Sequence, residues 1–79
     1  MSIIKISSDI TVTTDSSGAP KAVLFDGDAV TDGNIGDDTA SFVLSEIKRR
    51  TGHSVRFTGW AGPWPTAGGE QVEGRLSPV

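Results

Sequence analysis

The sequence predicts an α+β domain: an antiparallel sheet of about four to five strands with one α-helix packed on one face. Three observations support this class. Runs rich in β-branched or alternating apolar residues lie in both halves of the chain, one segment between them has the apolar period of a helix, and turn residues separate the runs. The 79 residues are enough for a single domain, predicted to span residues 1–79.

The first 26 residues predict an antiparallel hairpin or meander. Four apolar side chains keep one period-two phase across Ser7–Asp9, which fits one bent strand or two short ones: Ile4, Ile6, Ile10 and Val12. Turn residues at 15–20 precede an apolar strand at 21–25, which Asp26 and Gly27 close. Residues 29–31 are a candidate for a further short strand, followed by a loop.

One helix is predicted from Asp38 to Arg50. Its apolar residues fall at i, i+3, i+4 and i+7, namely Ala40, Val43, Leu44 and Ile47. Asp37 or Asp38 is predicted to cap its first turn, and Gly52 to supply the left-handed residue that ends it. Phe42 lies off the apolar stripe, so it either flanks the core or is exposed.

The C-terminal third predicts two strands separated by an irregular segment. Val55 and Phe57 alternate with polar residues as the inward side chains of a strand at 54–58. Four glycines and two prolines occur in 59–69, which predicts an ordered loop or flap rather than regular structure. Residues 71–76 are expected to return as a weak edge strand.

Charge is distributed unevenly along the chain, whose net charge is −3. Residues 26–38 contain five of the ten acidic side chains and neither lysine nor arginine. Residues 1–46 carry two lysines against eight acidic residues, and 47–79 carry five basic residues against two acidic ones. This pattern predicts a negative and a positive surface, and the net charge argues against direct binding of nucleic acid.

Composition excludes several kinds of chemistry. The chain has no cysteine, which rules out thiol catalysis, iron–sulfur clusters and thiolate zinc sites and fits a reducing compartment. Its first ten residues contain neither the apolar core of a signal peptide nor a membrane span. We therefore expect a cytoplasmic protein without membrane contact.

Two short acidic motifs predict no catalytic or metal site when weighed in full. Asp26 and Asp28 follow an apolar strand as in the first motif of haloacid-dehalogenase-like phosphotransferases, but Ala29 and Val30 replace its Gly and Thr. Read as a calcium loop, the run lacks a ligand at its third position and the bidentate Glu at its twelfth. His53 is the only histidine and is interpreted as a helix-end residue, so no catalytic residue, metal or cofactor is expected.

Partner binding is the remaining hypothesis. The acidic side chains of the run can stand in for phosphates on a basic surface, or can simply form turns and cap the helix. Of Trp60 and Trp64, one is predicted to be buried and the other partly exposed to a partner. The predicted partner-binding residues are Asp26, Asp28, Asp32, Asp37, Asp38, Trp60 and Trp64.

In size, acidity and lack of catalytic groups, the whole chain resembles small phage-encoded anti-CRISPR proteins, in particular those directed at type I effectors. The resemblance includes no shared motif and therefore assigns no residue. It implies a non-enzymatic inhibitor that blocks the DNA path of a nucleic-acid-handling complex and, if phage-encoded, acts in the host cytoplasm. We expect a monomer or weak homodimer. The alternatives are a structural or assembly protein of a phage particle or homo-oligomer, and a small metal-dependent phosphotransferase.

Overall fold

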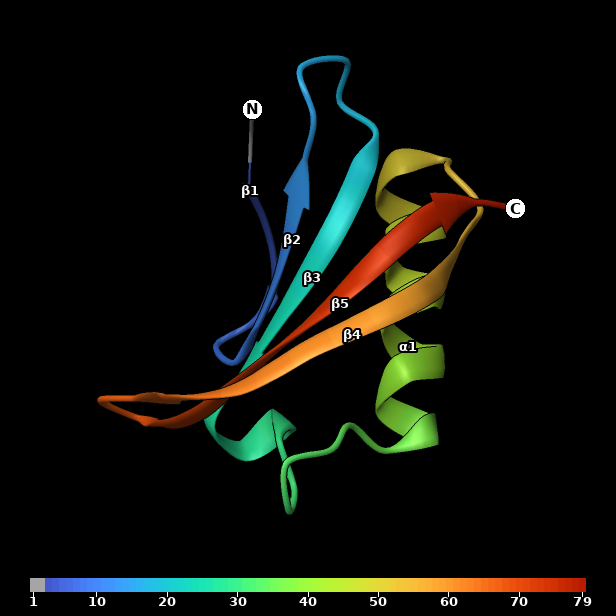
Figure 1. Cartoon of the computed structure of the whole chain (residues 1–79). Coiled ribbons are helices and arrows are strands. Elements are labelled where there is room, and N and C mark those ends of the chain that lie inside the picture. Colours follow the sequence, from blue (N-terminus) through green and yellow to red (C-terminus); the bar gives the residue numbers. More distant parts are fainter. Residues whose placement is uncertain (1–2) are drawn as a thin grey trace.

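The computed structural model of the chain describes residues 3–79 and contains a five-stranded antiparallel sheet with one helix against one face (Figure 1). The predicted α+β class is therefore confirmed. Met1 and Ser2, which the predicted domain includes, lie outside the described residues. The elements are β1 (Ile3–Ser7), β2 (Ile10–Thr14), β3 (Pro20–Asp26), the 3-10 turn η1 (Gly27–Ala29), α1 (Asp37–Thr51), β4 (Val55–Thr66) and β5 (Gly69–Pro78).

The strand order is β1-β2-β3-β5-β4. The first three strands form the predicted meander, and the in-phase isoleucines and valine belong to two short strands, β1 and β2. Helix α1 carries the chain from the end of β3 to the start of β4, and β5 then pairs antiparallel with both of these strands. The result is a split β-α-β unit with its helix on one face of the sheet and the other face open.

The predicted edge position of residues 71–76 is wrong, because β5 lies inside the sheet between β3 and β4. Its inward residues Val72, Gly74 and Leu76 are buried against the helix side. Glu73 and Arg75 point to the open face, where charged side chains remain in water. Polar and apolar residues alternate in β5 because only one face of the sheet is covered by the helix, and not because β5 is an edge strand.

The predicted loop or flap at 59–69 is also wrong, because β4 continues to Thr66 and only Ala67 and Gly68 form the turn into β5. Register shifts between Phe57 and Gly59, and between Ala61 and Trp64, absorb the extra residues. Prolines are tolerated because β4 is an edge strand, where a backbone N–H on the outer side needs no partner strand.

The segment after β3 contains no further strand. Residues 27–29 form the turn η1, and Thr31 makes only an isolated bridge to Asn34. Small and turn-forming residues dominate here, and Gly27, Asp32 and Gly33 adopt positive φ angles of 51°, 53° and 76°. Such angles suit glycine and aspartate, and here they turn the chain instead of extending it as a strand.

Helix α1 begins one residue before the predicted start and ends one residue after the predicted end. Gly36 is the N-cap residue and no side chain caps it, so the prediction that Asp37 or Asp38 is the cap is wrong. Both carboxylates lie instead in the first turn, where the free backbone N–H groups favour negative charge. The predicted end is confirmed, since Gly52 is left-handed (φ 79°) and its N–H donates to Lys48 O at 2.9 Å.

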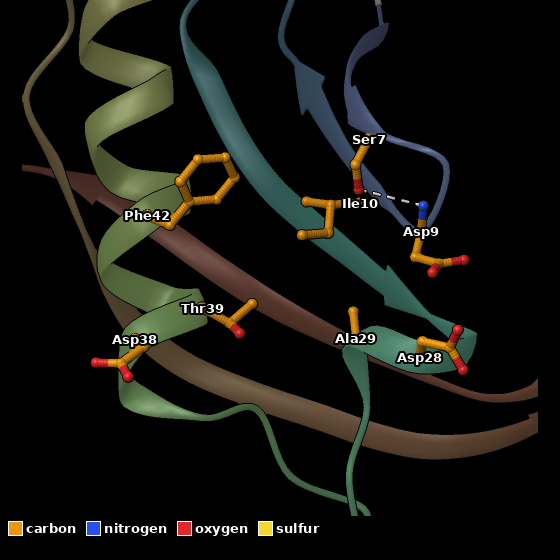
Figure 2. A pocket seen from close by; sticks show the side chains of 8 residues that line it. All are labelled: Ser7, Asp9, Ile10, Asp28, Ala29, Asp38, Thr39 and Phe42. Atoms are coloured by element: carbon orange, nitrogen blue, oxygen red, sulfur yellow. Dashed lines mark hydrogen bonds between the residues drawn. The ribbon is translucent and has the colours of Figure 1, made fainter.

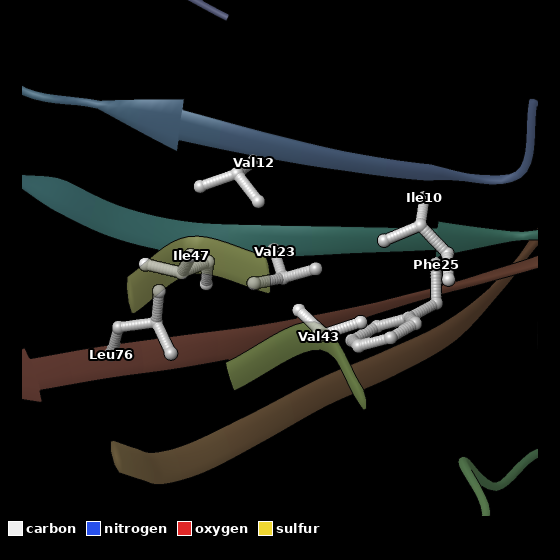
Figure 3. Packing of buried hydrophobic residues seen from close by; sticks show 7 residues of the cluster. All are labelled: Ile10, Val12, Val23, Phe25, Val43, Ile47 and Leu76. Atoms are coloured by element: carbon white, nitrogen blue, oxygen red, sulfur yellow. The ribbon is translucent and has the colours of Figure 1, made fainter. Parts of the chain in front are cut away.

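The core lies between α1 and the covered sheet face (Figure 3). Phe25 is fully buried at its centre, with ring centroids 6.1 Å from Phe57 and 6.0 Å from Trp60. Phe57 and Trp60 stack on each other at 4.6 Å. The other buried members are Ile10, Val12, Val23, Val43, Ile47 and Leu76.

Gly74 makes this aromatic stack possible, since a Cβ there would come within 2.7 Å of the Phe57 ring and 2.8 Å of the Trp60 ring. We expect Gly74→Ala to displace these rings and to lower the free energy of unfolding by about 1–3 kcal/mol. Urea denaturation followed by tryptophan fluorescence measures both effects. Gly59→Ala is the matched control, because nothing lies within 4 Å of a Cβ at that position. Equal stability of the two variants would contradict the packing described.

Glu46 carries a pH-dependent contribution to stability. The Arg49 guanidinium donates to Glu46 Oε1 at 2.7 Å and, with Arg50, holds the pKa of that carboxyl below its ordinary value. A depressed pKa stabilises the fold above the ordinary value of 4.5, and the stabilisation is lost as the pH falls through the lower folded value. Wild type is therefore expected to exceed Glu46→Gln in urea midpoint at pH 6 but not near pH 2. An equal gap at both values would contradict this linkage.

Candidate functional site

Six aspartates lie at one end of the molecule, which we call the acidic end (Figure 1). They come from the β1–β2 turn, the end of β3, η1, the loop at 30–36 and the first turn of α1. The β1–β2 turn and the end of β3 meet because β2 and β3 are antiparallel neighbours, so that β2 begins where β3 ends. The Asp26 N–H donates to Asp9 O at 2.8 Å and joins the two segments. The acidic end consists of Asp9, Asp26, Asp28, Asp32, Asp37 and Asp38.

Turn formation explains how the backbone holds several of these carboxylates at the surface. Thr31 and Asn34 exchange backbone hydrogen bonds of 2.8 and 2.9 Å around the left-handed Asp32, and Asn34 Nδ2 donates to Asp32 O at 3.2 Å. The side chains of Asp28, Asp32, Asp37 and Asp38 are exposed. The aspartates thus act as turn and helix-start residues, and the same geometry presents their charge to solvent.

The acidic end is not neutralised internally. The ion pairs within residues 3–79 join Glu46 to Arg49, Glu46 to Arg50 and Glu73 to Arg75, and none includes an aspartate of this end. Five basic residues lie toward the opposite end of the sheet and helix, where β3 and β4 begin and α1 finishes: Lys21, Lys48, Arg49, Arg50 and Arg56. The charge asymmetry along the sequence is therefore also an asymmetry in space.

An open pocket of about 370 Å³ lies within the acidic end, between α1 and the β1–β2 turn (Figure 2). Asp9 and Asp28 lie on one side and Phe42 on the helix side, while the Asp38 carboxylate is directed outward. Phe42 is 51% exposed, so of the two predicted alternatives, a flank of the core or an exposed position, the exposed position is correct. The remaining lining residues are Ser7, Ile10, Ala29 and Thr39.

Sequence reasoning missed Asp9 and Phe42 as members of this site. Phe42 lies one helical turn after Asp38, so their i, i+4 spacing could have placed both on one side of α1. Asp9 is remote from the acidic run in sequence, and its place depends on the hairpin that brings the β1–β2 turn beside Gly27. A Cβ at Gly27 would lie 3.2 Å from Asp9 Oδ1.

Neither tryptophan is buried: Trp60 is 50% and Trp64 44% exposed. The prediction of one buried tryptophan is wrong because Phe25 and Phe57 already fill the core beneath β4 and β5. The register places Trp60 opposite Gly74, on the helix side, and Trp64 opposite Gln71, on the open face. The two rings therefore belong to different surfaces.

The predicted partner-binding residues share one end of the molecule but form separate groups. Asp28 and Asp38 line the Phe42 pocket, and Asp37 lines a second pocket of about 290 Å³ together with Trp60. Asp26 lies on the open face, where its Oδ1 accepts a hydrogen bond from Gln71 Nε2 at 2.9 Å. Trp64 lies on the other side of Gln71, because the register pairs Gln71 with both Asp26 and Trp64. Asp32 lies in the turn between Thr31 and Asn34.

Two residues weighed as catalytic candidates, Asp26 of the phosphotransferase-like motif and His53, form hydrogen bonds within the fold. Asp26 is engaged by Gln71, and His53 is exposed after α1 with its backbone N–H donating to Thr51 Oγ1 at 3.2 Å. Within residues 3–79, no three acidic or histidine side chains are grouped so that they could hold a metal ion. In the same part of the chain, no helix has the length and apolarity needed to cross a membrane.

No protein-family model matches this chain, and neither a curated protein nor a solved structure shows detectable similarity to it. The geometry and charge of the acidic end are therefore the basis for a functional proposal.

Proposed function

We propose that the protein is a non-enzymatic inhibitor whose acidic end docks on the basic nucleic-acid-binding surface of a protein complex. A CRISPR-type effector is the proposed target, and blocked access of DNA the proposed result. The observation that carries the proposal is the set of six aspartates at one end, none of them in an ion pair within residues 3–79. A surface built to hold phosphates attracts carboxylates by the same Coulomb interaction.

The dimensions of the protein suit this role. Its extents are 31 × 24 × 20 Å, and its accessible surface is 4782 Å². A stable interface takes roughly 800 Å² from each partner, which is about a sixth of this surface and comparable to one end of the molecule. Phe42 and Trp60 supply exposed aromatic surface beside the carboxylates, the kind of side chain that contributes most to binding at interface centres.

The direct test uses a purified, guide-loaded type I effector complex and a fluorescently labelled target duplex. We expect increasing protein to abolish binding of the duplex, with an endpoint at a fixed ratio of protein to complex. Full binding of the duplex at saturating protein would contradict the proposal for that effector.

A second candidate function, assembly into a homo-oligomer, is favoured by the basic residues opposite the acidic end. Contact between unlike ends generates head-to-tail chains. Sedimentation velocity at 20 mM and 500 mM salt separates the two functions, because surface charge interactions are largely screened at the higher concentration. We expect a monomer or weak dimer at both concentrations for the inhibitor. Large species at low salt that dissociate at high salt would favour assembly.

A further inference from the structure

The second pocket combines an aromatic wall, a carboxylate and an apolar floor. It lies between the loop at 30–36, the first turn of α1 and β4, and it has a volume of about 290 Å³. Trp60 and Asp37 line it together with Ile35 and Val72, and none of its lining residues is a lysine or arginine. Its size is near the lower limit of about 300 Å³ for small-molecule sites, which suits a single inserted side chain.

The aromatic wall is held in place before any ligand binds. The Trp60 ring stacks on Phe57 at 4.6 Å with an interplanar angle of 27°, and its centroid lies 6.0 Å from that of the buried Phe25. Gly74 leaves room for this position, since a Cβ there would clash with both outer rings. Half of the Trp60 surface nevertheless remains exposed. A fixed, exposed indole loses little freedom when a ligand stacks on it.

The carboxylate of this pocket is available to a ligand. Asp37 is exposed, and no ion pair within residues 3–79 includes it. An indole face attracts a cation through its quadrupole, and a nearby carboxylate adds an ion pair. Guanidinium fits this combination better than ammonium, because it is planar, stacks on aromatic rings and presents several N–H donors in one plane.

We propose that the Trp60–Asp37 pocket receives one arginine side chain of the protein partner. The inference rests on the proposed function, since it names the group that anchors the acidic end on a basic surface. Charge complementarity selects the occupant: the pocket lies at the end of the molecule that carries the six aspartates and is lined by no cation. The Asp37 carboxylate offsets the attraction that the free backbone N–H groups of the first turn of α1 have for an anion, and the other aspartates of this end add to the repulsion of a phosphate.

Titration of the isolated protein with N-acetyl-arginine amide, followed in ¹H–¹⁵N correlation spectra, tests this site. We expect saturable shifts of the Trp60 indole N–H and of the Asp37 and Ala40 amides, with a Kd on the order of 10 mM, as expected for a single stacked cation. The Trp64 indole, on the other face, is the internal control. Salt concentration is held constant throughout.

Matched ligands and variants separate the specific site from general charge attraction. N-acetyl-citrulline amide, which keeps the planar shape but lacks the charge, is expected to give no saturable shift. Asp37→Asn should weaken arginine binding by about five- to tenfold. Asp28→Asn, which removes an equal charge from the other pocket, should leave it within about twofold. No saturable shift at Trp60, equal binding of citrulline, or equal weakening by the two variants would overturn the arginine site.

Failure of this site and failure of the proposed function are distinguishable. The titration needs no partner, so a negative result with blocked DNA binding in the effector experiment removes only the arginine pocket. A positive titration with unblocked DNA binding removes the effector as the target and leaves an arginine-binding pocket.

Discussion

Replacing Phe25 with alanine is expected to lower the free energy of unfolding by about 3–5 kcal/mol. Phe25 is fully buried and contacts both Phe57 and Trp60, so its removal leaves a cavity beneath the aromatic stack and α1. Single domains have a total stability of about 5–15 kcal/mol, and small ones tend to lie toward the low end. The variant should therefore be largely unfolded at 37 °C.

Chemical denaturation followed by circular dichroism measures this loss. Phe42→Ala removes the same side chain from an exposed position on α1 and is the matched control, with an expected change below about 1 kcal/mol. Similar losses in the two variants would show that Phe25 is not the centre of the core.

Neutralising Asp28, Asp32 and Asp38 to asparagine is expected to slow association with the effector complex at least about tenfold at low salt. These side chains are exposed and outside the ion pairs of residues 3–79, and asparagine tolerates the positive φ of Asp32. The fold should therefore persist. Because the lost interaction is long-range, the difference from wild type should shrink as salt rises toward 1 M, where the Debye length is about 3 Å.

A charge-matched triple variant shows whether location matters. Asp15→Asn, Glu46→Gln and Glu73→Gln change the net charge by the same amount at positions outside the acidic end. Stopped-flow association rates at several salt concentrations should then differ between the two triple variants. Equal slowing would assign the effect to net charge alone and remove the acidic end from the mechanism.

Local patterns in the sequence predict the helix and the meander well. The apolar stripe and Gly52 define α1 to within one residue at each end, since helix periodicity and a left-handed terminal residue are properties of neighbouring residues. The β4–β5 hairpin was mispredicted because glycine and proline are poor strand residues in general but acceptable on a bulged edge strand. Whether a strand is an edge is decided by the whole sheet.

For the candidate site too, local patterns predict one part and tertiary structure decides the rest. The acidic run predicts a concentration of charge, and the structure places all of its aspartates at one end. The pockets, however, depend on strand register and on the helix packing angle. Asp9 joins Asp28 through the β1–β2 turn, and Trp60 joins Asp37 through the sheet order that puts β4 at the edge beside α1. These pairings require tertiary structure.

Hydrogen–deuterium exchange of the protein with and without bound effector complex tests most directly which end makes the contact. Backbone amides protected by binding should lie in the β1–β2 turn and in residues 26–40. Amides of the turn at 15–19 and of residues 48–56 should exchange at the same rate in both states. Protection confined to residues 48–56, with the aspartate-bearing segments unchanged, would contradict docking through the acidic end.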